Sequence, residues 1–321
     1  MTDYQTIYHF KNANNEAKIV GPNNRFWHLM EDFYQAEVLI RHSEVKMVDH
    51  HSQINIIEKY LNVVETILDN KITLNEVDLM SIMRNLSLEN QDQVISLYLN
   101  KQVLLITTSG KAVYPRTFAQ KLFIETLNKD DIVFAVGPAG TGKTFLAVLY
   151  AVSMLKSGNV KKIILVRPVV EAGEKLGYLP GDVKEKIDPY LIPLYDGLNE
   201  ALGKETVNKM LEKGTIEIAP LAYMRGRTLE DALVILDEGQ NASLLQMKMF
   251  LTRLGFGSKM IITGDITQVD LPNRNNSGLV EVLDLLSDIS GIGFVYFTDI
   301  DVMRHPLVQK IVKKYEGHYG N

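Results

Sequence analysis

The sequence predicts an α/β protein with a mainly parallel sheet, preceded by a small α+β module. From about residue 119, nearly continuous apolar runs alternate with helical stretches, which is typical of parallel strands buried on both faces. Before residue 100, short β-like runs lie among segments with helical periodicity. We therefore expect a small module with a helical linker over residues 1–100 and a larger domain over residues 101–321.

The composition fits a folded chain of one large or two ordinary domains. Of 321 residues, 46% are hydrophobic, so a sizeable core can be buried. The net charge of −5 argues against a purely electrostatic nucleic-acid binder but allows a local basic face. Cysteine is absent, which excludes disulfides and thiolate metal sites. Neither an apolar run of about 20 residues nor a secretory start is present, so we expect a soluble cytoplasmic protein.

The elements of the first module follow from its periodicity. We expect a loose strand or arm over residues 1–20, a helix over 26–33, strands at 38–40 and 45–48, and helices over 54–68 and 75–86. A Thr73-x-x-Glu76 pattern predicts a capping box for the last helix. Residues 87–118 are expected to form a connection with a short hairpin that turns at Ser109-Gly110.

The larger domain is predicted to contain six strands. They are the runs DIVFAV, KKIILVR, TIEIA, ALVILD, KMIITGD and GIGFVYF. Helical stretches lie between most of them, as in a parallel α/β sheet. The stretch over residues 171–198 is long for a loop, so we expect it to carry its own helices and to contact a substrate or a neighbouring subunit.

A glycine-rich loop directly follows the first of these strands. Its residues are Gly137, Pro138, Ala139, Gly140, Thr141, Gly142, Lys143 and Thr144. The loop fits the phosphate-binding pattern G-x-x-x-x-G-K-[ST], and an amphipathic helix follows it. Glycines let backbone N–H groups wrap a phosphate, and the helix N-terminus adds its positive end. We expect Lys143 to reach the β and γ oxygens of ATP, and Thr144 to bind Mg²⁺.

The fourth strand ends in a pair of carboxylates. Ligands bind at the carboxyl ends of strands in open α/β sheets, so Asp237 and Glu238 are expected beside the phosphate loop. We predict that Asp237 binds Mg²⁺ through water, and that Glu238 is the base or the residue that positions the attacking water. An N-cap of the next helix is the structural alternative for Asp237. Gln240 either senses the γ-phosphate or is a surface residue.

The fifth strand ends in a further polar group, Gly264-Asp265, with Gln268 three residues later. Asp265 and Gln268 recur in the matching motif of helicases. At the end of an adjacent strand, they are placed to contact the γ-phosphate or the attacking water. A capped loop is the structural alternative.

Seven stretches of the chain resemble PhoH-like proteins. They are GPAGTGKTFLAV, VRPVVEAGEKLGYLPGD, EKIDPYLIPLYDGL, IEIAPLAYMRGRTLEDALVILDEGQN, QMKMFLTRLGFGSKMIITGD, TQVDLP and RHPLV. The resemblance covers about residues 110–315. It implies a cytoplasmic bacterial ATPase with a RecA-like P-loop core of the superfamily-1 helicase type, preceded by a KH-like domain. It also implies a role in RNA metabolism and ribosomal RNA maturation, often beside a small endoribonuclease.

The resemblance assigns three further sites. Gln120 resembles the glutamine with which helicases read adenine, the alternative being a polar residue at a helix start. Arg167 occupies the place of a helicase motif that touches the nucleic-acid backbone. KH domains grip RNA with a Gly-x-x-Gly loop between two helices. The nearest match is Gly21 to Asn24, ahead of the first predicted helix and without a second glycine. RNA contact there and a structural or oligomerisation role both stay open.

We expect only one motor domain in this chain. A superfamily-1 motor has two RecA-like domains, and the second supplies arginines to the γ-phosphate. The residues after Thr144 are used by the strands of one sheet. The arginines must then come from a neighbouring copy, as an arginine finger acts in trans. Candidates are Arg225, Arg227 and Arg304, with salt bridges or RNA phosphate as their alternative partners. We therefore expect a homo-oligomer, specifically a ring hexamer.

The leading functional hypothesis is Mg²⁺-dependent ATP hydrolysis coupled to RNA binding, unwinding or remodelling. The alternative is an ATP-gated oligomeric scaffold that docks an endoribonuclease without processive unwinding. A small-molecule kinase shares the phosphate loop, but the Asp-Glu-x-Gln pattern and the lack of an evident acceptor lid count against it. No acidic cluster resembles a two-metal nuclease site, so no intrinsic nuclease activity is predicted.

Overall fold

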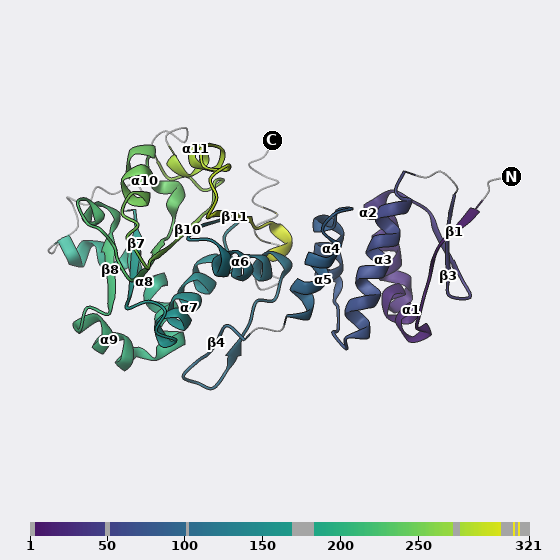
Figure 1. Ribbon diagram of the computed structural model, residues 1–321. Helices are drawn as coiled ribbons and strands as arrows, with labels where there is room; N and C mark the ends of the chain where they lie inside the picture. Colours follow the sequence, from purple (N-terminus) through teal and green to yellow (C-terminus); the bar gives the residue numbers. More distant parts are fainter. Residues whose placement is uncertain are drawn as a thin grey trace. The chain divides into compact units, whose positions relative to one another are not determined.

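The computed structural model describes residues 4–48, 52–100, 103–168, 183–271 and 277–302, together with residues 311 and 314. The chain divides into two compact units, whose elements Figure 1 colours along the sequence. The first unit comprises Met1–Gln102 and Arg116–Lys121, and the second comprises Val103–Pro115 and Leu122–Asn321.

The first unit combines helices with a three-stranded antiparallel sheet in the order β1-β3-β2. Its elements are β1 Tyr4–His9, α1 Ala13–Val20, η1 Pro22–Asn24, α2 Arg25–Tyr34, β2 Val38–Arg41, β3 Glu44–Val48, α3 Ile54–Asp69, α4 Glu76–Asn85 and α5 Gln91–Leu99. The turn between β2 and β3 has positive φ at both His42 and Ser43, as a tight two-residue hairpin requires. Met47, Ile57 and Leu61 are fully buried in the core.

Two helices of the first unit lie where the sequence predicts none. Helix α1 occupies part of the expected loose arm, and α5 lies in the expected connection. The start of α1 is set by a polar contact, because the Asn12 side chain accepts from the Asn14 N–H at 3.0 Å. Asparagine at an N-cap favours a helix start although it is a poor former inside a helix. Because this segment is rich in asparagine, its helix is not apparent from the spacing of apolar residues.

The predicted Thr73–Glu76 capping box is wrong. Helix α4 is capped two residues later, by Asn75 and Asp78. The Asn75 side chain accepts from the Asp78 N–H, and the Asp78 carboxylate accepts from the Asn75 N–H, both at 3.0 Å. Glu76 is the first helical residue (N1), two positions before the N3 place from which a side chain reaches back to the cap.

The second unit is built on a six-stranded parallel sheet, as predicted. Its elements are β4 Leu105–Ile106, β5 Ala112–Val113, α6 Phe118–Lys129 (which starts in the first unit), β6 Ile132–Val136, α7 Lys143–Lys156, β7 Lys162–Arg167, α8 Val183–Leu202, α9 Lys204–Glu212, β8 Ile216–Pro220, η3 Leu221–Met224, β9 Ala232–Leu236, η4 Gly239–Asn241, α10 Leu244–Leu251, β10 Lys259–Gly264, α11 Gly278–Leu285, β11 Ile292–Tyr296 and η6 Asp299–Asp301. All six predicted strands are present, and the predicted short hairpin is β4-β5.

The sheet order, β11-β6-β10-β9-β7-β8, decides where the site lies. All its neighbouring strands pair in parallel, and every residue of β6 and β9 is buried. Strand β10 lies between β6 and β9. The glycine-rich loop after β6 and the carboxylates after β9 therefore emerge on either side of the β10 end, at one edge of the sheet.

None of the helices in the described ranges is both long and apolar enough to cross a membrane.

Candidate active site

The glycine-rich loop adopts backbone angles that glycine makes possible. The φ angle is +149° at Gly137, +84° at Gly140 and +85° at Gly142. A Cβ on Gly137 would lie 2.3 Å from the carbonyl oxygen of Phe297, so the close approach of the chain after β11 requires glycine. Gly142 immediately precedes α7, which brings the N-terminus of that helix to the loop. A helix N-terminus beside wrapped backbone N–H groups is a site for phosphate.

Lys143 lies inside this loop and is 7% exposed. Its Nζ donates to the carbonyl oxygens of Gly137 and Pro138, each at 2.7 Å, and to the Thr141 hydroxyl at 3.2 Å. The ammonium is thus held by acceptors of the loop to which it belongs. A phosphate bound in the loop would meet this charge directly, which suits the predicted role of Lys143.

Thr144 and Asp237, the two residues predicted to hold Mg²⁺, are in contact. The Thr144 hydroxyl donates to Asp237 Oδ1 at 2.6 Å, and the Thr263 hydroxyl donates to the same oxygen at 2.7 Å. Asp237 is 4% exposed. Helix α10 is capped by Ser243 and not by Asp237, which removes the N-cap alternative for that helix. Hydroxyl and carboxylate oxygens are ligands that Mg²⁺ accepts.

Within the described part of the chain, no group of three or more His, Cys, Asp or Glu side chains is arranged to hold a metal. An ion at Thr144 and Asp237 would therefore complete its shell with water and with phosphate oxygens. This is how Mg²⁺ is commonly bound beside nucleotides, because it keeps several of its waters. The residues present fit a magnesium nucleotide better than a metal cage formed by protein alone.

Glu238 follows Asp237 at the same edge, and both of its carboxylate oxygens accept hydrogen bonds. Arg167 Nη2 lies 3.1 Å from Oε1, and Gln240 Nε2 lies 2.5 Å from Oε2. Gln240 is 1% exposed, so the surface-residue alternative is wrong. Its Oε1 also accepts from the Asp265 N–H at 3.0 Å. Gln240 thus joins the carboxylate after β9 to the loop after β10.

Asp265 and Gln268 hold that loop together. Asp265 Oδ1 accepts from the N–H and hydroxyl of Thr267, at 2.9 and 2.6 Å, and Oδ2 accepts from Gln268 Nε2 at 2.8 Å. The capped-loop alternative therefore describes their contacts. Both residues also line the cavity at the phosphate loop, so the predicted contact with nucleotide stays a prediction.

A cavity of about 420 Å³ unites these groups. Besides the loop, Asp237, Glu238, Asp265 and Gln268, its lining includes Arg167 and two residues that the sequence did not single out, Asp196 and Glu200. Their spacing of four residues on α8 was the available signal, because it places side chains on one helix face. At Gly197 a Cβ would lie 3.3 Å from the Val148 side chain of α7, so glycine allows close packing of the two helices.

The candidate arginines differ in their contacts. Arg227 forms a two-pronged ion pair with Glu217, with N–O distances of 2.5 and 2.8 Å. The hydrogen bond from Arg227 lowers the pKa of Glu217 and raises that of Arg227. Arg227 thus takes the salt-bridge alternative within its own chain. Arg225 is exposed, and among the described residues no ion pair is recorded for it. Arg304 lies outside the described residues.

Gln120 lies at the start of α6 and is 4% exposed. Its side-chain oxygen accepts from the Arg116 N–H at 2.8 Å, and its own N–H donates to the Thr117 hydroxyl at 3.3 Å. These contacts agree with the helix-start alternative. Arg116, Thr117 and Gln120 all belong to the Arg116–Lys121 segment of the first unit, and the adenine contact of Gln120 stays a prediction.

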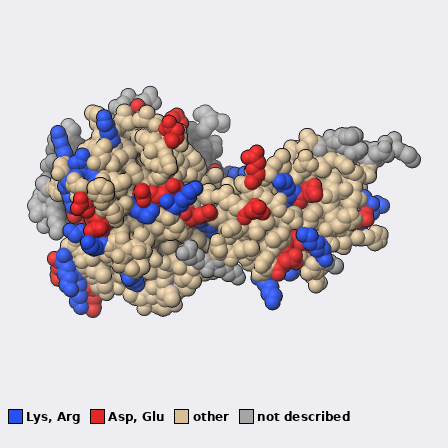
Figure 2. All heavy atoms as spheres, in the orientation of Figure 1, with Lys and Arg blue, Asp and Glu red and all other residues tan. Residues whose placement is uncertain are grey.

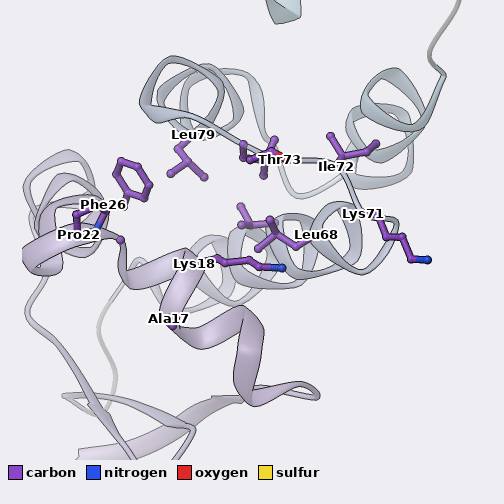
Figure 3. A pocket seen from close by; sticks show the side chains of 12 residues that line it. Ala17, Lys18, Pro22, Phe26, Leu68, Lys71, Ile72, Thr73 and Leu79 are labelled. Atoms are coloured by element: carbon purple, nitrogen blue, oxygen red, sulfur yellow. The ribbon is translucent and has the colours of Figure 1, made fainter.

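The first unit contains a separate cavity of about 580 Å³. Figure 3 shows its apolar lining, with Phe26, Leu68 and Leu79 facing the hollow and the lysines Lys18 and Lys71 beside it. The lining also includes Gly21, where φ is +73° and a Cβ would lie 2.5 Å from the Phe26 ring. The absence of a side chain at Gly21 therefore allows the Phe26 ring to pack against the loop between α1 and α2.

Charge is mixed on the face of the molecule shown in Figure 2. Basic and acidic side chains of the described residues are interspersed there instead of gathering into one field. This agrees with the net charge of −5. Recognition of an anionic partner on that face would depend on individual contacts more than on a broad potential.

The comparisons with known proteins agree with this architecture. Residues 112–316 match the PhoH family, described as PhoH-like protein. The chain is 44% identical over 306 residues to a PhoH-like protein of Bacillus subtilis, covering 95% of each chain. It is 47% identical over 281 residues to a PhoH-like protein of Synechocystis, covering 88% of this chain and 85% of that one. It is 54% identical over 211 residues to a PhoH-like protein of Mycobacterium tuberculosis, covering 66% and 60%.

The matches to the Bacillus subtilis and Synechocystis proteins span both units, and all of these matches are far stronger than a shared fold alone requires. Together with the phosphate loop and the Thr144–Asp237 contact, they support an ATPase in general. The chain belongs to the PhoH-like protein family.

Proposed function

We propose that this protein hydrolyses ATP with Mg²⁺ and couples hydrolysis to the binding and remodelling of RNA. The observation that carries the ATPase part is the contact between Thr144 and Asp237 beside the phosphate loop. A cation bound by these two residues would lie beside the loop that we propose to hold the β- and γ-phosphates. Glu238, one residue further, is placed to orient water for attack on the γ-phosphate, and Lys143 to stabilise the charge that develops.

Support for the RNA part comes from the first unit. The segment from Gly21 to Asn24 connects α1 to α2, the position that a Gly-x-x-Gly loop holds between two helices in KH domains. Asn24 takes the last place with φ of +60°, a left-handed conformation that asparagine tolerates better than most residues. The missing second glycine is therefore no obstacle to this backbone path.

The proposed assembly is a ring of identical subunits, a hexamer, in which one copy completes the site of the next. Arg225 is our candidate for the arginine that acts in trans, because it is exposed while Arg227 is paired with Glu217. Docking of an endoribonuclease belongs to the same proposal. It rests on the family resemblance, since no surface of the described residues identifies that partner.

The test measures phosphate release by the purified full-length chain with Mg²⁺, with and without single-stranded RNA, and strand displacement from a labelled RNA duplex. Lys143→Ala should abolish hydrolysis, whereas Lys156→Ala, an exposed lysine at the end of the same helix, should not. Hydrolysis by Lys143→Ala at the normal rate would overturn the nucleotide site. If the protein hydrolyses ATP but neither binds RNA nor is stimulated by it, the RNA part of the proposal is overturned. A change of oligomer mass with ATP, without strand displacement, would favour the scaffold alternative.

A further inference from the structure

The Glu238 carboxylate is held by two donors of its own chain. Arg167 occupies Oε1 and Gln240 occupies Oε2. The Arg167 side chain is 18% exposed and that of Glu238 37%, so the guanidinium is the more sheltered partner. Partial shelter from solvent strengthens such a pair relative to one on the open surface. One of the two oxygens that could orient water is therefore already engaged by a cation.

The backbone at Glu238 is held in place, so a change at this residue would involve its side chain. Its φ of +55° and ψ of +41° are left-handed, a conformation that costs a non-glycine residue about 1 kcal/mol or more. The next residue, Gly239, is fixed against β10, because a Cβ there would lie 2.8 Å from the Ile262 side chain. The turn is thus determined by packing. The carboxylate is oriented by two hydrogen bonds, from Gln240 to Oε2 and from Arg167 to Oε1.

Arg167 is placed to respond to a ligand other than Glu238. It is the last residue of β7, the strand that pairs with β9, and it lines the cavity of the phosphate loop. Asp237 and Arg167 are tied through the sheet, since the Asp237 N–H donates to the carbonyl of Val166 at 2.8 Å. A guanidinium binds a phosphodiester as readily as a carboxylate, through the same planar donors.

We propose that Arg167 is a gate between RNA and ATP hydrolysis. In the ion pair it draws Oε1 of Glu238 away from the water that attacks the γ-phosphate. When a backbone phosphate of RNA engages the guanidinium, Oε1 is released, and Glu238 orients that water. Arg167 is a positioning residue in this scheme, because it acts through Glu238. The inference rests on the proposed function and specifies how RNA regulates the same site.

The experiment compares the wild type with Arg167→Ala and with Arg167→Gln, which keeps more of the side-chain volume. The control is Lys162→Ala, which removes a cation at the opposite end of the same strand. Thermal unfolding first verifies that each variant is folded. ATP hydrolysis is then followed at varied ATP concentration, with and without polyuridylate, and polyuridylate binding is measured at several salt concentrations.

Both Arg167 variants should raise kcat without RNA by about tenfold, within the usual range of coupling between two sites. The KM for ATP should change little, and polyuridylate should give no further increase. The salt dependence of RNA binding should weaken by about one phosphate contact. Lys162→Ala should keep a low basal rate and full stimulation.

Two results separate the gate from the function on which it rests. A wild type that hydrolyses ATP without any response to RNA would contradict the proposed function. A wild type stimulated by RNA, together with folded Arg167 variants whose basal rate is unchanged or lower and whose stimulation is intact, would overturn the gate alone. A fall in kcat would instead mean that Arg167 holds Glu238 in its working position.

Discussion

The hydroxyl of Thr144 and the carboxylate of Asp237 meet at 2.6 Å, although 93 residues separate them in the chain. The contact exists because β10 lies between the strands that precede the two residues, and Thr263 of β10 donates to the same carboxylate oxygen. One oxygen of Asp237 therefore accepts hydrogen bonds from the first turn of α7 and from β10.

Substitution of Asp237 by Asn should separate nucleotide binding from hydrolysis. The amide keeps the shape but loses the negative charge that attracts Mg²⁺, so we expect hydrolysis to fall by about 100-fold or more, as when other charge-stabilising groups are removed. Binding of a fluorescent ATP analogue in EDTA should persist. Asp288→Asn, at an exposed position outside the cavity, should leave both properties unchanged. A normal rate and normal Mg²⁺ dependence in Asp237→Asn would contradict the assignment.

Gln240 should affect catalysis as well as stability. Gln240→Ala leaves the buried Asp265 N–H without its acceptor, which should lower the free energy of unfolding by about 1–3 kcal/mol. It also loosens the loop that lines the phosphate site, so kcat should fall with little change in KM. Gln246→Ala is the control variant. It removes the capping box of α10, which should lower the free energy of unfolding by about 1 kcal/mol, and it should leave the kinetics of hydrolysis unchanged. Urea unfolding and steady-state hydrolysis measure the two effects, and equal kinetics in both variants would make Gln240 purely structural.

Arg225 should act on the neighbouring subunit. If it does, Arg225→Ala and Lys143→Ala each lose hydrolysis, with a fall of about 1,000-fold or more expected for the missing arginine. Mixing the two proteins should restore activity, because an intact phosphate loop then faces an intact Arg225. Arg227→Ala should instead reduce stability by leaving Glu217 unpaired. Full activity of Arg225→Ala alone, or a mixture as inactive as its components, would exclude this role.

Lys121 should make stability depend on pH. Burial lowers the pKa of its ammonium to about 8 from 10.5, against the opposing attraction of Asp78. Its Nζ also lies 3.5 Å from the centre of the Tyr98 ring. Between these two pH values the unfolded chain holds a proton that the folded chain has released, so the free energy of unfolding should rise with pH across this window. Chemical denaturation of wild type and Lys121→Met tests this.

The Lys121→Met variant should lack most of that rise. Lys129→Met, at the exposed end of the same helix, is the control and should retain it. A rise of equal size in all three proteins would assign the dependence to other groups.

Much of the site could be predicted from the sequence because it depends on residues that are close together in the chain. Glycine is needed at Gly137 for a close approach and at Gly142 for a left-handed turn, and Lys143 and Thr144 follow at fixed spacing. The six strands are equally local, since each is a short, mainly apolar run, and β6 and β9 are buried along their whole length. The helices of the first unit were harder to predict from the sequence. Helix α1 has few apolar positions, and a suitable cap pattern at Thr73 lies two residues from the one that is used.

By itself, the sequence determined the phosphate loop, the two carboxylates after β9 and the parallel α/β class. Only the tertiary structure decided that β10 separates β6 from β9, that Gln240 is buried, and that Arg167 pairs with Glu238. It also brought Asp196 and Glu200 of α8 to the cavity. The physical reason is the range of the interactions. Backbone freedom and strand burial are set within a few residues, whereas contacts across 71 or 93 positions depend on which strands become neighbours.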